Sequence, residues 1–291
     1  MSLKGKNVII TGSGRGIGKN IAIACAKEGA NIGITSRTLE ELQQVKKEIE
    51  KVSDVKVVIK TADITDYDAV EIMFKNFHED LGEFYGVIAN AGMSGRYDTH
   101  KFTAEKFAKI IEVNVNGVFH TFKASYPFLK KDNKKDKARF IITGSAAYAA
   151  AMPKFAAYTA SKYAVVGLQK ELSIEYRRDN INFNMILPTM VDTQLLRGDK
   201  AGDGNAPPSV MDPDDLNEYY LFLLSEAANR VSDELIFTNE ITPFRKALKD
   251  VPENLKGDWS KYKDYLEEND KSAYKAVKNN KKLAKYLFKN Q

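Results

Sequence analysis

Short apolar runs alternate with longer helix-like stretches along most of this chain, and this alternation restricts the fold more than any other feature. Strands that are apolar throughout and separated by helices are typical of a parallel sheet covered on both faces. The pattern therefore predicts an α/β fold with a doubly wound parallel sheet of the Rossmann type. The expected strands are residues 7–11, 31–36, 55–61, 85–89, 139–143 and 182–187, and the expected helices are residues 17–27, 39–52, 69–81, 104–129 and 157–178.

Two segments depart from the alternation. Residues 189–215 are rich in Gly, Pro, Asp and Ala, which predicts a long loop able to act as a lid. From residue 243 onward the chain is rich in Lys, Asn and Tyr and carries helical patches. We therefore expect one α/β domain at residues 1–242, which includes the lid, followed by a helical C-terminal extension at residues 243–291.

Charge and composition exclude several classes of partner. The net charge is +5, and residues 250–291 carry ten Lys interleaved with seven Asp or Glu, so we expect no nucleic-acid surface. No apolar segment is long enough to span a bilayer, and we expect no membrane partner. The single cysteine, Cys25, lies in an apolar helical run and cannot form an internal disulfide, which fits a reducing cytoplasm. The three histidines lack metal-ligand spacing, so no metal site is expected.

A glycine-rich turn follows the first expected strand and leads directly into a helix. Glycine lets the backbone approach a pyrophosphate, and the helix N-terminus offers free N–H groups and a positive dipole end. A P-loop is excluded because Ser13 and Asn20 stand where that motif needs Gly and a hydroxyl. The turn therefore predicts a dinucleotide site. Its residues are Gly12, Ser13, Gly14, Arg15, Gly16, Ile17 and Gly18.

The end of the second expected strand bears on the choice of cofactor. NAD-binding folds usually place Asp or Glu there to hold a ribose 2′-hydroxyl, but this chain has Ser36 and Arg37. Arg37 can pair with a 2′-phosphate, and Arg15 stands in the turn on the same side. The alternative is that both arginines are solvated surface charges. The pattern favours NADP(H) over NAD(H).

A serine, a tyrosine and a lysine form the candidate catalytic group. Tyr158 and Lys162 are four residues apart and project from one helix face, while Ser145 follows an expected strand at its carboxyl end. We expect the ammonium group to lower the pKa of the phenol, which would let Tyr158 exchange protons near neutral pH. Asn114 lies in a long apolar helix, where its side chain could bind an ordered water and relay protons from Lys162.

These pieces resemble the short-chain dehydrogenase/reductase family over about residues 5–195. The turn is similar to the cofactor loop of the family, and Asn114, Ser145, Tyr158 and Lys162 match its catalytic tetrad. The resemblance implies that Tyr158 and Lys162 also contact the cofactor. It further implies that Asn90, Ala91 and Gly92 brace the sheet and approach the cofactor. Asp63 and Ile64 would contact the adenine, and Pro188, Val191 and Thr193 would contact the nicotinamide end.

The chain also departs from the family pattern. Thr189 follows Pro188 where the family commonly has glycine, and residues 234–239 form the candidate last strand without the usual glycine pair. The extension has no counterpart in the family. The resemblance implies a homo-oligomer. Because family tetramers pack partly through their C-terminal regions, the choice between dimer and tetramer stays open.

The combined prediction is an oxidoreductase that transfers a hydride between NADP(H) and a carbonyl or alcohol, with Tyr158 as acid/base. Met93, Tyr148, Phe155 and Met190 are expected near the substrate, which favours an apolar small-molecule carbonyl compound. One alternative is a 3-oxoacyl-type ketoreductase. Another is a non-catalytic NADP(H)-binding interaction protein that docks a partner through its extension.

Overall fold

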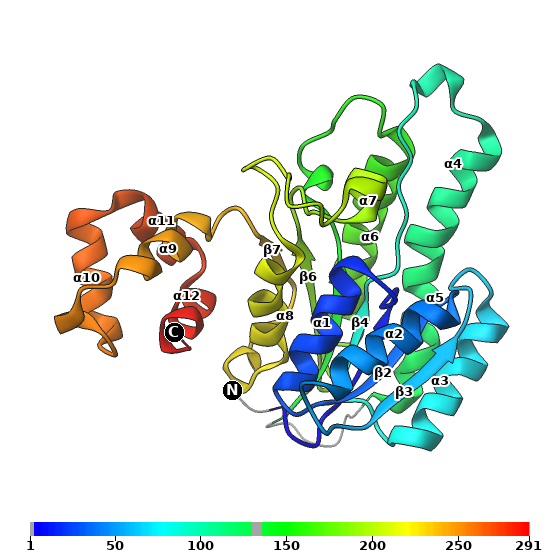
Figure 1. Cartoon of the computed structure of the whole chain (residues 1–291), viewed down its shortest axis with the longest axis horizontal. Coiled ribbons are helices and arrows are strands. Elements are labelled where there is room, and N and C mark those ends of the chain that lie inside the picture. The colour runs from blue at the N-terminus through cyan, green and yellow to red at the C-terminus, as the bar shows by residue number, and fades with distance from the viewer. Residues whose placement is uncertain (1–2, 130–135, 291) are drawn as a thin grey trace.

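A seven-stranded parallel sheet forms the centre of the computed structural model, which describes residues 3–129 and 136–290 (Figure 1). The strand order is β3-β2-β1-β4-β5-β6-β7, and every neighbouring pair is parallel. The chain runs outward from β1 to β3 and then returns to the other side of β1, so the topological switch lies between β1 and β4. The predicted doubly wound sheet is confirmed. The strands are β1 (Asn7–Thr11), β2 (Asn31–Ser36), β3 (Val57–Thr61), β4 (Gly86–Ala89), β5 (Ala138–Thr143), β6 (Ile181–Leu187) and β7 (Glu234–Phe237).

Helices cover both faces of the sheet, and each face has its own hydrophobic core. One core includes side chains of α1, α2 and α8, and the other includes side chains of α3, α5 and α6. Within β1, Val8 and Ile10 belong to the first core and Ile9 to the second, which explains why the three central positions of the strand are all apolar. The helices are α1 (Gly16–Lys27), α2 (Leu39–Glu50), α3 (Tyr67–Leu81), α5 (Gly117–Ser125), α6 (Ala156–Glu175) and α8 (Asn217–Leu224).

The long helix expected at residues 104–129 is interrupted. α4 (Ala104–Ile111) passes through a π-helical turn, Glu112–Asn116, into α5, and a 3-10 turn follows at Tyr126–Phe128. A π turn inserts one residue into the helical repeat, and such insertions are frequent at functional sites. The apolar periodicity continues across the turn, so the sequence pattern alone indicated one unbroken helix.

The predicted lid is a loop with short helical turns inside it. α7 (Gln194–Arg197) is followed by 3-10 turns at Gly198–Lys200 and Pro213–Leu216. Arg197 forms two ion pairs within the lid, with Asp192 at 3.0 Å and with Asp203 at 2.9 Å. These two ion pairs connect the first half of the segment to its middle.

The predicted helical extension is present as α9 (Thr242–Ala247), α10 (Trp259–Asn269), α11 (Lys271–Asn279) and α12 (Lys281–Lys289), coloured orange to red in Figure 1. Its interior is aromatic, since the Phe288 ring lies 5.1 Å from that of Tyr262 and 5.5 Å from that of Trp259. Tyr286 joins the extension to the body through a 5.3 Å ring contact with Phe222 of α8. The extension therefore shares one hydrophobic core with α1 and α8.

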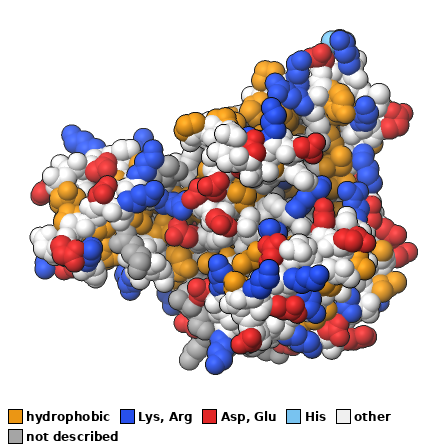
Figure 2. Space-filling view, viewed as in Figure 1, with side chains coloured by type: hydrophobic (Ala, Val, Ile, Leu, Met, Phe, Trp, Pro, Cys, Tyr) orange, Lys and Arg blue, Asp and Glu red, His pale blue; other side chains and the backbone are white. Residues whose placement is uncertain are grey.

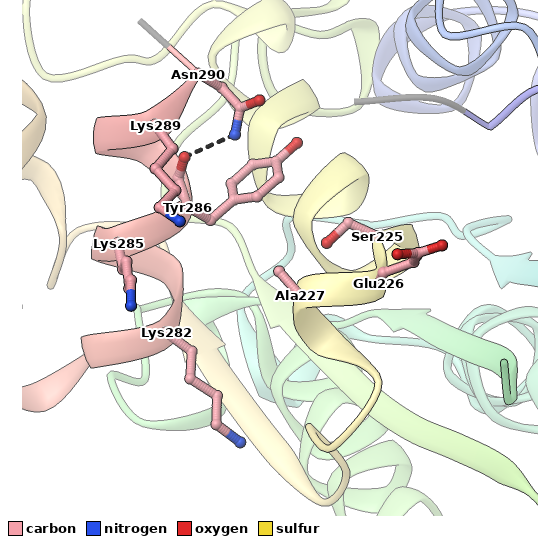
Figure 3. A pocket seen from close by; sticks show the side chains of 8 residues that line it. All are labelled: Ser225, Glu226, Ala227, Lys282, Lys285, Tyr286, Lys289 and Asn290. Atoms are coloured by element: carbon pink, nitrogen blue, oxygen red, sulfur yellow. Dashed lines mark hydrogen bonds between the residues drawn. The ribbon is translucent and has the colours of Figure 1, made fainter. Parts of the chain in front are cut away.

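A cleft of about 640 Å³ remains between α12 and the 3-10 turn Glu226–Ala228. Figure 3 shows its three lysines, Lys282, Lys285 and Lys289, spaced along α12 with Glu226 on the opposite side. Across residues 3–129 and 136–290, no helix combines the length and apolarity needed to cross a membrane.

Candidate active site

The glycine turn between β1 and α1 keeps side-chain atoms away from the switch point. Gly12 has a φ of +64°, and a Cβ there would lie 2.7 Å from the Cα of Ala91. A Cβ at Gly18 would lie 2.4 Å from the carbonyl oxygen of Gly12, so only glycine lets α1 start this close to the strand. The result is a cradle of bare backbone at a helix N-terminus, which fits the pyrophosphate of a dinucleotide.

A single cleft of about 800 Å³ opens at the carboxyl ends of the strands and collects most of the predicted site residues. Four predicted residues, Ser13, Gly18, Asn114 and Tyr148, are not among its lining. The predicted residues that line it are Gly12, Gly14, Arg15, Gly16, Ile17, Ser36, Arg37, Asp63, Ile64, Asn90, Ala91, Gly92, Met93, Ser145, Phe155, Tyr158, Lys162, Pro188, Met190, Val191 and Thr193.

Ser13 and Asn90 brace the floor of the cleft. The Ser13 hydroxyl donates to the carbonyl oxygen of Ile10 at 3.0 Å and accepts from the backbone N–H of Thr35 at 2.9 Å, which ties β1 to β2. The Asn90 amide donates to the carbonyl oxygens of Thr11 and Gly12 at 3.0 and 3.1 Å. The turn is therefore held by buried hydrogen bonds from both neighbouring strands.

The end of the cleft beside β2 and α2 carries the two predicted arginines. It also carries an acid, Glu41, that was not predicted. Arg15 is 3.3 Å from Glu41, which stands in the first turn of α2, and Arg37 lines the same region. Asp63 accepts from the backbone and hydroxyl of Thr65, and mainly the backbone hydrogen bond lowers the pKa of its carboxyl.

Tyr158, Lys162 and Ser145 meet at the other end of the cleft, beside β5 and α6. Tyr158 and Lys162 lie one turn apart near the start of α6, and the lysine Nζ is 5.4 Å from the centre of the phenol ring. This Nζ donates to the carbonyl oxygen of Thr143, the last residue of β5, at 3.1 Å. Ser145 follows β5 and hydrogen-bonds the phenol. The side chains converge as predicted, within the cleft that holds the glycine turn.

Burial dominates the titration of both groups. It raises the pKa of the Tyr158 phenol, and a hydrogen bond from Ser145 offsets part of that rise. Burial also lowers the pKa of Lys162 to about 8. The expected lowering of the Tyr158 pKa is therefore wrong for the protein without a bound cofactor, because burial, which disfavours the phenolate, is the largest influence on this pKa. At neutral pH the phenol holds its proton and can act as an acid.

Asn114 occupies the π turn and is buried behind the cleft. Its Oδ1 accepts from the backbone N–H of Met93 at 2.8 Å, and its Nδ2 donates to the carbonyl oxygen of Met93 and to the Ser161 hydroxyl, both at 2.9 Å. Both amide hydrogens are thus used within the protein. This differs from the expectation of a water-binding side chain, and Asn114 instead positions the segment after β4 against α6.

The apolar wall of the cleft differs in part from the predicted substrate set. Tyr148 packs against Tyr163 and Phe237, with ring centres 5.1 and 6.2 Å away, and does not line the cleft. Met152, on the loop after β5, does line it and was not predicted. A loop residue has no periodicity that would point it inward, so the sequence could not rank Met152.

Comparison with known proteins extends these observations. The family model for short chain dehydrogenases matches residues 6–203. A 3-ketodihydrosphingosine reductase of Mus musculus is 33% identical over 199 residues, which is 66% of this chain and 58% of the mouse protein. The chain thus spans less than two thirds of the length of this relative.

Two solved structures match nearly their whole chains. A 3-ketoacyl-(acyl-carrier-protein) reductase from Brucella melitensis, complexed with NADH, has a TM-score of 0.73 at 28% identity and covers 81% of this chain and 97% of its own. An alcohol dehydrogenase from Thermococcus sibiricus, complexed with 5-hydroxy-NADP, has a TM-score of 0.71 at 29% identity, covering 80% and 95%. Both neighbours support a nicotinamide cofactor. The chain belongs to the short-chain dehydrogenase/reductase family of oxidoreductases.

Proposed function

We propose that this protein transfers a hydride between NADP(H) and a carbonyl or alcohol carbon, with Tyr158 as the acid/base. The observation that carries the proposal is that Ser145, Tyr158 and Lys162 line the same cleft as the glycine turn. A chance tyrosine–lysine pair on a helix would have no reason to face a dinucleotide cradle. This convergence also argues against the non-catalytic alternative.

The side chains divide the work of carbonyl reduction. The bound nicotinamide supplies the hydride or, in the reverse direction, accepts it. Ser145 donates a hydrogen bond to the carbonyl oxygen and polarises it. Tyr158 gives its proton to the same oxygen, and its raised pKa keeps that proton available at neutral pH. Lys162 is mostly cationic below its pKa of about 8 and stabilises the phenolate left behind.

Arg15 and Arg37 support the choice of NADP(H). Both line the end of the cleft beside β2 and α2, and a guanidinium pairs well with a phosphate dianion. Glu41 favours the alternative, because a carboxylate beside Arg15 could accept a ribose hydroxyl of NAD(H) instead. The structural neighbours include one complex with NADH and one with an NADP derivative. Two arginines against one acid favour NADP(H).

The substrate we propose is an apolar ketone. Met93, Met152, Phe155, Met190 and Leu195 line the cleft around the catalytic end. The mouse relative is named for 3-ketodihydrosphingosine and the Brucella neighbour for 3-ketoacyl groups, and ketone reduction is common to both names. A 3-oxoacyl-type ketoreductase remains the second candidate. The cytoplasmic location and the oligomeric state stay predictions.

Replacing Tyr158 by Phe tests the proposal directly. The variant removes the transferable proton and keeps the ring, so we expect kcat for NADPH-dependent ketone reduction to fall by about 10²- to 10⁴-fold. NADPH oxidation against a panel of ketones measures this effect. Tyr163→Phe is the matched control, because Tyr163 lies on the same helix but is exposed outside the cleft. Near wild-type turnover in Tyr158→Phe would refute the assignment.

A further inference from the structure

Large apolar side chains are exposed around the entrance of the active-site cleft. Tyr97, Phe107, Met152, Met190 and Leu195 are each 38–46% exposed, and we call these five residues the entrance rim. Three of the five, Met152, Met190 and Leu195, also line the cleft. Apolar surface that is gathered at one place on a protein marks an interaction site, whereas single exposed apolar residues do not.

Three separate segments meet to form the rim. The backbone N–H of Tyr97 donates to the carbonyl oxygen of Lys154 at 2.9 Å, which joins the segment before α4 to the loop that carries Met152. The hydroxyl of Ser94 donates to the carbonyl oxygen of Leu195 at 3.2 Å, which joins the same segment to the lid. The rim is therefore continuous from α4 to α7.

Aromatic rings extend the rim along the start of α4. The Tyr97 ring lies 4.8 Å from that of Phe102, which in turn lies 6.1 Å from that of Phe107. The Lys106 ammonium sits 4.6 Å from the centre of the Tyr97 ring. Aromatic rings with a neighbouring cation are suited to the boundary between lipid headgroups and acyl chains.

The charge of the segments that carry the rim is mildly positive. Residues 93–109, 150–155 and 189–203 carry seven basic side chains against five acidic ones. The positive excess lies on the first two segments, where Asp98 is shared by Lys154 at 3.1 Å and Lys101 at 3.8 Å. Figure 2 shows lysine and arginine side chains beside hydrophobic ones at the top of the molecule, where α4 begins. An apolar patch framed by cations is complementary to an anionic bilayer.

We propose that the entrance rim docks on the surface of an anionic lipid bilayer, so that the cleft opens toward the lipid. An amphipathic ketone could then pass from the bilayer into the cleft without crossing water. The docking stands on the rim alone, while the lipid-ketone substrate rests on the proposed function. The sequence expectation of no membrane partner considered only spanning segments, and the rim is assembled from parts that are far apart in the chain.

The extension offers a second cationic surface, which differs from the entrance rim because it presents no apolar side chains. Residues 271–289 carry seven lysines and no acid. Neither Lys285 nor Lys289 has an ion-pair partner among the residues that the structure describes. The apolar side chains of α12, such as Leu287 and Phe288, are buried against the rest of the protein. This surface can attract anions, but it presents no apolar side chains that could enter a bilayer.

Co-sedimentation with lipid vesicles tests the docking without any turnover. We expect the full chain to sediment with vesicles of phosphatidylcholine and phosphatidylglycerol in equal amounts, and to remain in solution with phosphatidylcholine alone. The Lys101→Glu/Lys106→Glu variant should lower the partition coefficient at least about tenfold, because each basic residue near an anionic surface contributes about 1 kcal/mol. Phe107→Ser should lower it by a few-fold, since one exposed ring is lost.

The matched control is Lys285→Glu/Lys289→Glu on α12, which makes the same change in net charge. It should keep nearly wild-type binding. The proposal is overturned if the wild type does not bind anionic vesicles at low salt, or if the α12 variant loses binding as much as the rim variant. Turnover of a water-soluble ketone is measured in parallel and should be unchanged in the rim variants. Vesicle binding by a wild type without that turnover would reject the proposed function and leave the docking intact.

Discussion

The body and the extension differ in what they bury. Around the cleft, the body buries polar side chains, and Asn114, Ser161 and Lys162 are all 6% exposed or less. In the extension, the buried side chains that the structure describes are hydrophobic, with Phe288 and Leu283 as examples. Burying a polar group costs free energy unless the group is hydrogen-bonded, and each of these three side chains donates a hydrogen bond within the protein. The extension, by contrast, is built for packing.

Truncating a core side chain of the extension tests whether the extension contributes to stability alone. Phe288→Ala removes a ring that packs against Trp259 and Tyr262. We expect a loss of about 3–5 kcal/mol in the free energy of unfolding, from lost apolar burial and from the cavity left behind. Urea unfolding measures the loss. The kcat per folded molecule should stay at the wild-type level.

Tyr265→Ala serves as the control for Phe288→Ala, because Tyr265 lies on α10 but is 37% exposed. Its effect on stability should be small, at most about 1 kcal/mol. A fall in kcat in Phe288→Ala at unchanged folded fraction would show that the extension takes part in the chemistry. The division between a catalytic body and a packing extension would then fail.

Removing one arginine from the cofactor end should produce the next largest effect. Arg37→Ala deletes a guanidinium that lines the cleft beside Asp63 and Ser36. We expect KM for NADPH to rise about tenfold to a hundredfold, since a charge-assisted hydrogen bond contributes about 1.5–3 kcal/mol. KM for NADH should change little, because NADH lacks the 2′-phosphate. An equal rise for both cofactors would contradict a phosphate contact.

The sheet was predictable from the sequence because its strands are buried on both faces, which makes most of their residues apolar. α8 was not predicted. Tyr219, Tyr220, Phe222, Leu223 and Leu224 are all buried, so the helix has no polar face and shows no helical periodicity. The π turn was missed for a related reason, because apolar residues continue across it.

The candidate catalytic residues were predictable because their spacing is local. Tyr158 and Lys162 are one helical turn apart, and Ser145 directly follows a strand. Glu41 and Met152 were not predictable in the same way, since each reaches the cleft from a different element through the tertiary fold. The direction of the Tyr158 pKa shift was also missed, because burial cannot be read from spacing.

The pH dependence should separate chemistry from stability within the body. The pKa of Lys162 is lowered to about 8, so its positive charge is lost above that pH while Tyr158 stays protonated. We expect kcat/KM for NADPH in ketone reduction to fall by up to about tenfold per pH unit above pH 8. A flat profile between neutral pH and pH 10 would contradict a role for the lysine charge.

The stability contribution of the same lysine has the opposite sign. Its pKa in the folded protein, about 8, lies below the ordinary value of 10.5. The unfolded chain therefore binds more protons between these two pH values, and the free energy of unfolding due to this group rises with pH. Urea unfolding over that range measures this contribution to stability, which should grow while kcat/KM falls.

The smallest expected effect concerns Glu41, whose exposed ion pair with Arg15 is screened by solvent. If the cleft prefers NADPH, Glu41→Gln should lower KM for NADPH by roughly two- to fivefold, because Arg15 is released toward the 2′-phosphate. Glu48→Gln is the control, since Glu48 lies on the same helix but pairs with Lys19 at 3.0 Å outside the cleft. A rise in KM for NADH in Glu41→Gln, with no gain for NADPH, would instead assign Glu41 to a ribose hydroxyl and make NAD(H) the cofactor.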